Sequence, residues 1–171
     1  MPINKVMLAT LKAITALEPK VEKTYKFERK FEELAGHIHS RPPDYKMWDQ
    51  PVVYDGCSIP VRMFVPETEG DHPLIIFFHG GGWVTGSIEN YTEVCLNLAK
   101  ATGCMVASVD YRLAPEYKFP TAVRDCYAVT RAFFTSNLPG IDKDKITLMG
   151  ASAGGNLAAA VSLMARDKGE F

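Results

Sequence analysis

Two glycine-rich motifs, each placed directly after a short apolar run, constrain the fold of this chain more than any other feature. The first is His79–Trp83 (HGGGW), which follows the apolar run 74–78, and the second is Gly150–Gly154 (GASAG), which follows the run 145–149. A short apolar run bounded by turn signals is typical of a buried strand. Each motif is therefore predicted to begin where a strand ends.

Strands and helices are predicted to alternate from residue 74 onward. This alternation predicts an α/β fold with a parallel sheet and helices on its faces. The segments 51–54 and 59–65 precede it and read as a hairpin around Asp55-Gly56. The strands expected after this hairpin are 74–78, 104–109 and 145–149, and the helices are 91–101, 121–136 and 155–165.

The first forty residues read as helical. Apolar residues recur at helical spacing over 1–17, Pro19 interrupts the pattern, and a second helix is predicted over 21–35. Their apolar side chains either pack against the domain or form a lid over a pocket, and the sequence favours neither. We expect two parts: an N-terminal helical cap segment, 1–45, and the N-terminal part of an α/β core, 46–171.

Charge and composition exclude several classes of function. The 19 basic and 20 acidic residues give a net charge of −1, and no basic cluster exists, so we expect neither nucleic-acid binding nor an anionic-membrane surface. No apolar stretch approaches the roughly 18 residues of a membrane span, and no signal-like segment opens the chain, so the expected location is cytoplasmic. The wide cysteine spacing predicts buried thiols, and His37 and His39 lack partners at metal-ligand spacing, so no metal site is expected.

The second motif supplies what a serine nucleophile needs. A hydroxyl is a weak nucleophile that requires exposure, a base and donors for the negative charge it creates. A tight turn between strand and helix exposes Ser152, and the small residues around it permit such a turn. The amide of Ala153, at the start of the helix, and those of Gly81 and Gly82 are the predicted oxyanion donors. Removing one such donor typically costs roughly 3–4 kcal/mol in the barrier.

At this point the chain resembles the hormone-sensitive-lipase family of α/β-hydrolases, which includes esterases and arylacetamide deacetylases. The resemblance implies an α/β-hydrolase fold with a mostly parallel sheet, and hydrolysis of small carboxylic esters with short or medium acyl chains, without a cofactor. It also implies that Ser152 is the nucleophile, whereas His79 is structural and is not the catalytic base. The matching segments are 79–83 (HGGGW), 110–116 (DYRLAPE), 119–120 (FP), 125–126 (DC) and 150–157 (GASAGGNL).

The chain departs from the family pattern in two places. Ala151 stands where the family has an acidic residue, which lies outside the catalytic triad. More importantly, the order in α/β-hydrolases is Ser, then Asp or Glu, then His, and here only Asp167 and Glu170 follow Ser152, with no later His. A serine without its base loses most of its rate. We therefore predict a core truncated after the helix that follows the serine, with negligible turnover by itself.

Three interpretations of this pattern stay open. The chain is a fragment of a longer esterase, or one half of a two-chain hydrolase, or a non-catalytic relative that binds a small ligand as a receptor. Under the first two, the strand 145–149 would be left as an edge in this chain, and edge strands invite pairing. We expect self-association or a second polypeptide there.

Overall fold

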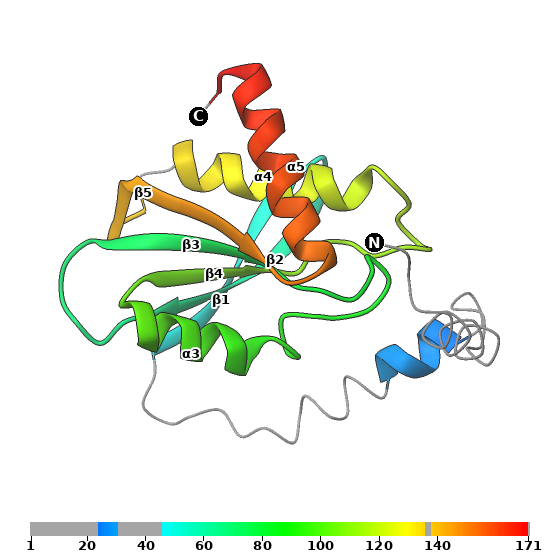
Figure 1. Cartoon of the computed structure of the whole chain (residues 1–171), viewed down its shortest axis with the longest axis horizontal. Helices are drawn as coiled ribbons and strands as arrows, with labels where there is room; N and C mark the ends of the chain where they lie inside the picture. The colour runs from blue at the N-terminus through cyan, green and yellow to red at the C-terminus, as the bar shows by residue number, and fades with distance from the viewer. Residues whose placement is uncertain (1–23, 31–45, 136–137, 171) are drawn as a thin grey trace, which may run out of the picture.

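The computed structural model describes residues 24–30, 46–135 and 138–170. Within these ranges a sheet of five strands has the order β1-β2-β4-β3-β5. Helices lie on both of its faces (Figure 1). The elements are β1 (Lys46–Tyr54), β2 (Cys57–Val65), β3 (His72–Phe78), α3 (Thr92–Thr102), β4 (Met105–Val109), α4 (Thr121–Thr135), β5 (Ile141–Gly150) and α5 (Ala153–Lys168).

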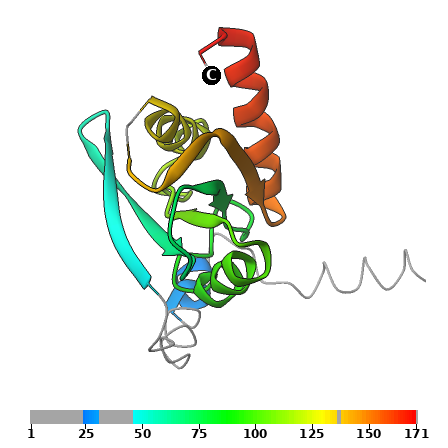
Figure 2. The same cartoon turned by 90° about the vertical axis from the view of Figure 1, so that its left-hand side faces the viewer.

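The expected α/β fold is confirmed, and its sheet is mixed rather than mostly parallel. β3 pairs in parallel with β4 and with β5, whereas β1 with β2 and β2 with β4 are antiparallel. The β1–β2 hairpin turns at Asp55 and Gly56, whose φ values of 50° and 70° fit a two-residue turn that matches strand twist. Figure 2 shows this hairpin reaching to one side of the other strands. The predicted alternation of strands and helices after residue 74 is confirmed.

Each face of the sheet has its own apolar core. α4 and α5 pack on one face and α3 on the other (Figures 1 and 2). The α3 core covers the face of β2 that is opposite to Val61 and Met63. Phe64 is fully buried because Cys95 and Leu96 of α3 cover that face, so β2 is buried on both faces.

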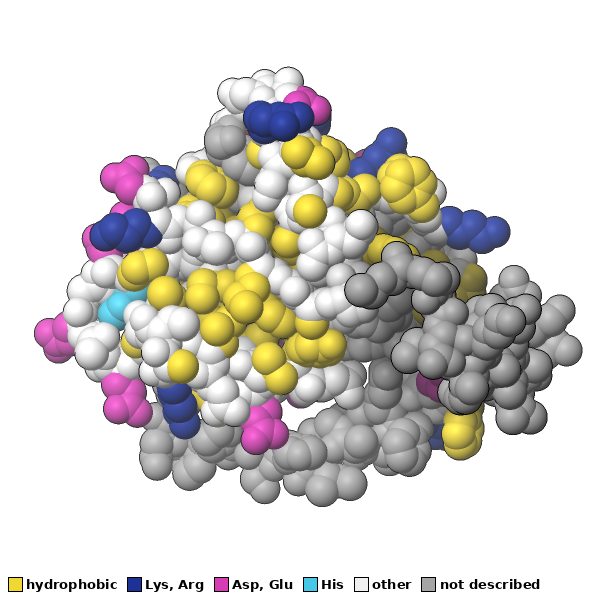
Figure 3. Space-filling model, viewed as in Figure 1, with side chains coloured by type: hydrophobic (Ala, Val, Ile, Leu, Met, Phe, Trp, Pro, Cys, Tyr) yellow, Lys and Arg dark blue, Asp and Glu magenta, His cyan; other side chains and the backbone are white. Residues whose placement is uncertain are grey.

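In the described part of the chain, β5 lies at one edge of the sheet and pairs only with β3. Ile146 and Leu148 pack partly against the α4–α5 core. On the opposite face, Met149 is 44% exposed. Figure 3 shows hydrophobic side chains gathered near the centre of the visible surface, in the region of β5 and α3. The expected edge strand is therefore present, with an incompletely covered face.

Several expectations fall partly outside the described residues. The helix 24–30 lies inside the predicted helix 21–35. The rest of that helix, the predicted helix 1–17 and the pair His37 and His39 lie outside the described ranges. All four cysteines are free, but only Cys95 and Cys126 are buried, since Cys57 and Cys104 are partly exposed. Of the helices described, none is long and apolar enough to cross a membrane.

Candidate active site

The two glycine motifs meet because they leave neighbouring strands at the same end. β3 and β5 are adjacent and parallel, with Phe78 opposite Gly150 at their carboxyl ends. The N–H of Ala151 donates to the carbonyl of Phe78 at 3.2 Å. A Cβ placed on Gly80 would lie 3.5 Å from the Cβ of Ser152. The carboxyl edge of a parallel sheet is where α/β proteins commonly bind ligands.

Ser152 lies in a strained turn between β5 and α5. Its φ of 51° and ψ of −116° place a residue with a Cβ in a region that costs of order 1–3 kcal/mol. The side chain is exposed, at the first turn of α5. The turn can close this tightly because residues 150 and 154 are glycines and have no Cβ. A Cβ on Gly150 would overlap the backbone of Gly154, and one on Gly154 would overlap the carbonyl of Phe78.

The glycine loop, residues 79–85, is shaped by hydrogen-bond donors that hold its carbonyl groups. The Tyr111 hydroxyl donates to the carbonyl of His79 at 2.8 Å, and His79 Nδ1 donates to the carbonyl of Gly80 at 2.8 Å. Val84 and Thr85 donate their N–H groups to the carbonyl of Gly81, at 3.0 and 2.8 Å. In a trans peptide the carbonyl and the following N–H point in opposite directions. These bonds therefore aim the amides of residues 80–82 away from the groups that hold the carbonyls.

His79 acts as a support within this loop. It is fully buried, and its ring stacks on that of Tyr111 with centroids 4.2 Å apart. Because a carbonyl only accepts hydrogen bonds, Nδ1 must carry a proton. Burial raises the pKa of Tyr111, so its hydroxyl also stays protonated as a donor. The sequence placed His79 in the loop but gave no sign of its partner.

The segment 110–116 follows β4, on the other side of β3, and braces the glycine loop. The N–H of Ala114 donates to the carbonyl of Trp83 at 2.9 Å. Arg112 is held by the fully buried Asp125, with its Nη2 and Nε 2.6 and 2.8 Å from the carboxylate oxygens. Asp125 also accepts from the backbone N–H of Arg112 at 3.1 Å. One buried carboxylate thus fixes both the side chain and the backbone of this segment.

Three backbone amides of the two glycine motifs lack a backbone acceptor in the described structure. In the described ranges, no backbone carbonyl accepts from the N–H of Gly81, Gly82 or Ala153. Gly81 has φ of 117°, and a Cβ there would overlap the carbonyl of Thr85. Only glycine satisfies both conditions at this position. The hydroxyl of Tyr91, a residue that no sequence motif marked, lies 2.7 Å from the position a Cβ on Gly80 would take.

Three other titratable side chains of the described residues, His72, Asp167 and Glu170, lie away from Ser152. His72 begins β3, at the opposite end of the strand from the glycine motif. Asp167 ion-pairs with Arg166, and Glu170 accepts from the Tyr127 hydroxyl at 2.8 Å, both at the far end of α5. Among the described residues, no group of three or more His, Cys, Asp or Glu side chains could hold a metal ion. Where the two glycine motifs meet, the described residues thus bring the Ser152 side chain close to the backbone of the 79–83 motif.

Known proteins resemble this chain over its whole described length. Residues 75–171 match a family described as having the alpha/beta hydrolase fold. An arylesterase of Saccharolobus solfataricus is 44% identical over 84% of this chain and 48% of its own length. A carboxylesterase, NlhH, of Mycobacterium tuberculosis is 37% identical over 74% of this chain and 41% of its own length. The chain therefore spans about half the length of these relatives.

A solved structure gives the same result. A hyperthermophilic esterase from the archaeon Pyrobaculum calidifontis superimposes with a TM-score of 0.80 at 36% identity, over 99% of this chain and 56% of that one. The order of the strands, the turn at Ser152 and the family match all indicate the same fold. The chain belongs to the α/β-hydrolase family, in its hormone-sensitive-lipase-like branch.

Proposed function

We propose that this chain supplies the nucleophile and the oxyanion-binding half of a carboxylic-ester hydrolase. Ser152 attacks the ester carbonyl carbon, and the carbonyl oxygen takes up the electron pair. The amides of Gly81, Gly82 and Ala153 receive that charge, aided by the positive end of the α5 dipole. The alcohol then leaves, and water releases the acid from Ser152. The observation that carries the proposal is the exposed serine beside three amides that lack backbone partners.

The proton-transfer half of the reaction lies outside the described site. A base must take the hydroxyl proton of Ser152 and return it to the departing alcohol. His79 is buried against Tyr111 and donates to a backbone carbonyl, so it does not fill that role. All four histidines precede Ser152 in the sequence. We therefore propose that the 171-residue chain alone turns over esters negligibly, and that a following Asp and His complete the triad.

A chimeric protein tests the nucleophile directly. Residue 171 is joined to the C-terminal half of the Saccharolobus solfataricus arylesterase, and hydrolysis of p-nitrophenyl acetate and butyrate is followed at 405 nm as a conventional absorbance assay. We expect the chimera to hydrolyse both esters and Ser152→Ala to lose about a thousandfold or more, as for other triad nucleophiles. Ser162→Ala, which changes a serine on the same helix, is the matched control. Equal rates for Ser152→Ala and its parent would refute the assignment.

We also propose that β5 pairs with a further polypeptide at its outer edge. Its backbone groups on that side and the 44% exposed Met149 are left without a neighbouring strand in the described sheet. Mass measurement by light scattering coupled to size exclusion tests this for the chain alone. We expect a dimer or larger species at micromolar concentration, and a monodisperse monomer of 18.9 kDa would contradict it.

A further inference from the structure

The side chain of Arg29 ties the N-terminal helix 24–30 to the glycine loop. Its Nε donates to the carbonyl of Val84 at 2.7 Å. Its Nη2 donates to the carbonyl of Ala114 at 2.7 Å and to Glu116 at 3.1 Å. The ring of Tyr25 lies 4.9 Å from the guanidinium carbon. One guanidinium therefore joins three segments that are distant in the sequence.

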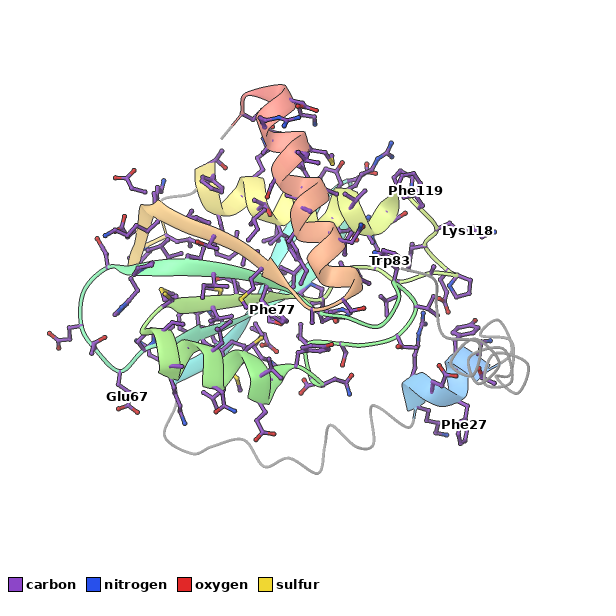
Figure 4. The ribbon with its side chains drawn as sticks, viewed as in Figure 1. Phe27, Glu67, Phe77, Trp83, Lys118 and Phe119 are labelled. Carbon is purple, nitrogen blue, oxygen red and sulfur yellow. The ribbon has the colours of Figure 1, made fainter. Side chains whose placement is uncertain are left out.

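The two carbonyl contacts of Arg29 fall on the frame that shapes the glycine loop. Val84 belongs to the turn whose N–H groups hold the carbonyl of Gly81. Ala114 is the residue whose N–H holds the carbonyl of Trp83. Arg29 thus holds the carbonyl of Val84 and the carbonyl of Ala114, the residue whose N–H holds the carbonyl of Trp83. Figure 4 shows Trp83 on the same side of the molecule as this helix, whose Phe27 points outward.

We propose that Arg29 is a positioning residue for the oxyanion site, through which the N-terminal helix sets the order of the glycine loop. The role rests on the function proposed above, because it matters to catalysis only if the amides of Gly81 and Gly82 receive an oxyanion. Loss of Arg29 frees the carbonyl of Val84, loosens the 81–85 turn and lets those amides turn away. Arginine suits this role because its planar fork holds several acceptors at once, whereas lysine is a single point of donation.

The carbonyl contacts, rather than the ion pair, carry the effect. The carboxylate of Glu116 is 44% exposed and the side chain of Arg29 29% exposed, and exposed ion pairs contribute little. Hydrogen bonds from a charged donor to backbone carbonyls are stronger than neutral ones. Removing the charge of Glu116 should therefore change the loop far less than removing Arg29.

Hydrogen exchange of backbone amides in the 171-residue chain tests the proposal without requiring ester turnover. The amides of Val84 and Thr85 report the turn, because both are bonded to the carbonyl of Gly81. We expect their exchange to accelerate about tenfold in Arg29→Ala, the loss of one or two charge-assisted bonds. Arg29→Lys should restore part of the protection, and Glu116→Gln should stay within about twofold of the parent. Lys30→Ala, on the same helix, is the matched control.

The outcomes separate a positioning role from simple anchoring of the helix. If residues 24–30 lose protection in Arg29→Ala while Val84 and Thr85 keep theirs, Arg29 only anchors the helix and the proposal is overturned. A second readout is the rate of slow phosphonylation of Ser152 by a fluorophosphonate, which should fall with the loss of protection. Unchanged phosphonylation together with faster exchange also overturns it. A loss of the proposed function would instead be seen as phosphonylation that persists in Ser152→Ala.

Discussion

The two halves of the candidate site obtain their geometry in different ways. The turn around Ser152 is shaped by residues within its own sequence, since Gly150 and Gly154 permit contacts that a side chain would block. The glycine loop has hydrogen bonds within itself and also depends on side chains far away in the sequence, such as Tyr111 at a separation of 32 residues and Arg29 at 55. The residues that permit the first geometry therefore lie within the turn itself, whereas the second also depends on residues distant in the sequence.

This difference predicts different responses to mutation. The turn around Ser152 should fail when atoms are added, because its backbone segments already touch. The glycine loop should fail when donors are removed, at positions outside the loop. Adding a methyl group to the turn and removing one donor from the loop therefore test the two halves of the site separately.

The largest effect is expected from Gly154→Ala. Its Cβ would overlap the carbonyl groups of Phe78 and His79, and backbone atoms cannot move aside cheaply. We expect a loss of about 3 kcal/mol or more in the free energy of unfolding, at or above the upper end for overpacking. Urea denaturation followed by circular dichroism measures it.

Gly155→Ala is the matched control for that experiment. A Cβ on Gly155 would lie 3.2 Å from the carbonyl oxygen of Gly150, a tight contact that a small shift relieves. Alanine also has a higher helix propensity than glycine, by up to about 1 kcal/mol. We expect the free energy of unfolding to stay within about 1 kcal/mol of the parent. Equal losses in the two variants would contradict the close backbone contact assigned to Gly154.

The next largest effect is expected from Asp125→Ala, in the segment contacts that support the glycine loop. Asp125→Ala removes the buried partner of Arg112 and leaves a cation that retains some access to water, since its side chain is 22% exposed. Breaking a fully buried pair costs about 3–5 kcal/mol, so we expect about 2–3 kcal/mol by urea denaturation. Asp167→Ala breaks an exposed pair with Arg166 and should stay within about 0.5 kcal/mol. A small loss at Asp125 would show that the segment 110–116 is held by other contacts.

A smaller effect is expected from Tyr111→Phe. The ring and its stacking on His79 are kept, and only the donor to the carbonyl of His79 is lost. Leaving a buried acceptor unsatisfied costs about 1–3 kcal/mol, and we expect the lower half of that range because the ring still fills its site. Thermal unfolding compares this variant with Tyr117→Phe, whose parent residue is 48% exposed. Indistinguishable melting temperatures for the two variants would contradict the support role of Tyr111.

The smallest effect is one of pH. Desolvation raises the pKa of Asp110, whose Oδ1 accepts from the N–H of Ile88 just beyond the glycine loop. A raised pKa contributes stability at low pH, which is lost as pH rises from about 4, the ordinary value, through the raised one. The unfolding free energy of the parent should therefore fall relative to Asp110→Asn over that range. A relative rise would contradict the desolvation of Asp110.

The same distinction explains what the sequence could predict. The strand positions, the turn at Asp55-Gly56 and the placement of Ser152 follow from local patterns of apolar and small residues. The mixed pairing of the sheet, the burial of Phe64 and the contacts of Arg29 depend on which segments meet in space. Arg29 lies in a helix of alternating charges, where no local signal separates it from its neighbours Lys26 and Lys30.

The most direct test of the account is the site of covalent labelling. The 171-residue chain is incubated for hours with excess fluorophosphonate, digested and analysed by mass spectrometry. We predict slow addition of one phosphonyl group at Ser152, and none in Ser152→Ala. Labelling at another serine of the same region, such as Ser87, with Ser152 unmodified, would contradict the claim that the turn after β5 and the glycine loop form one site.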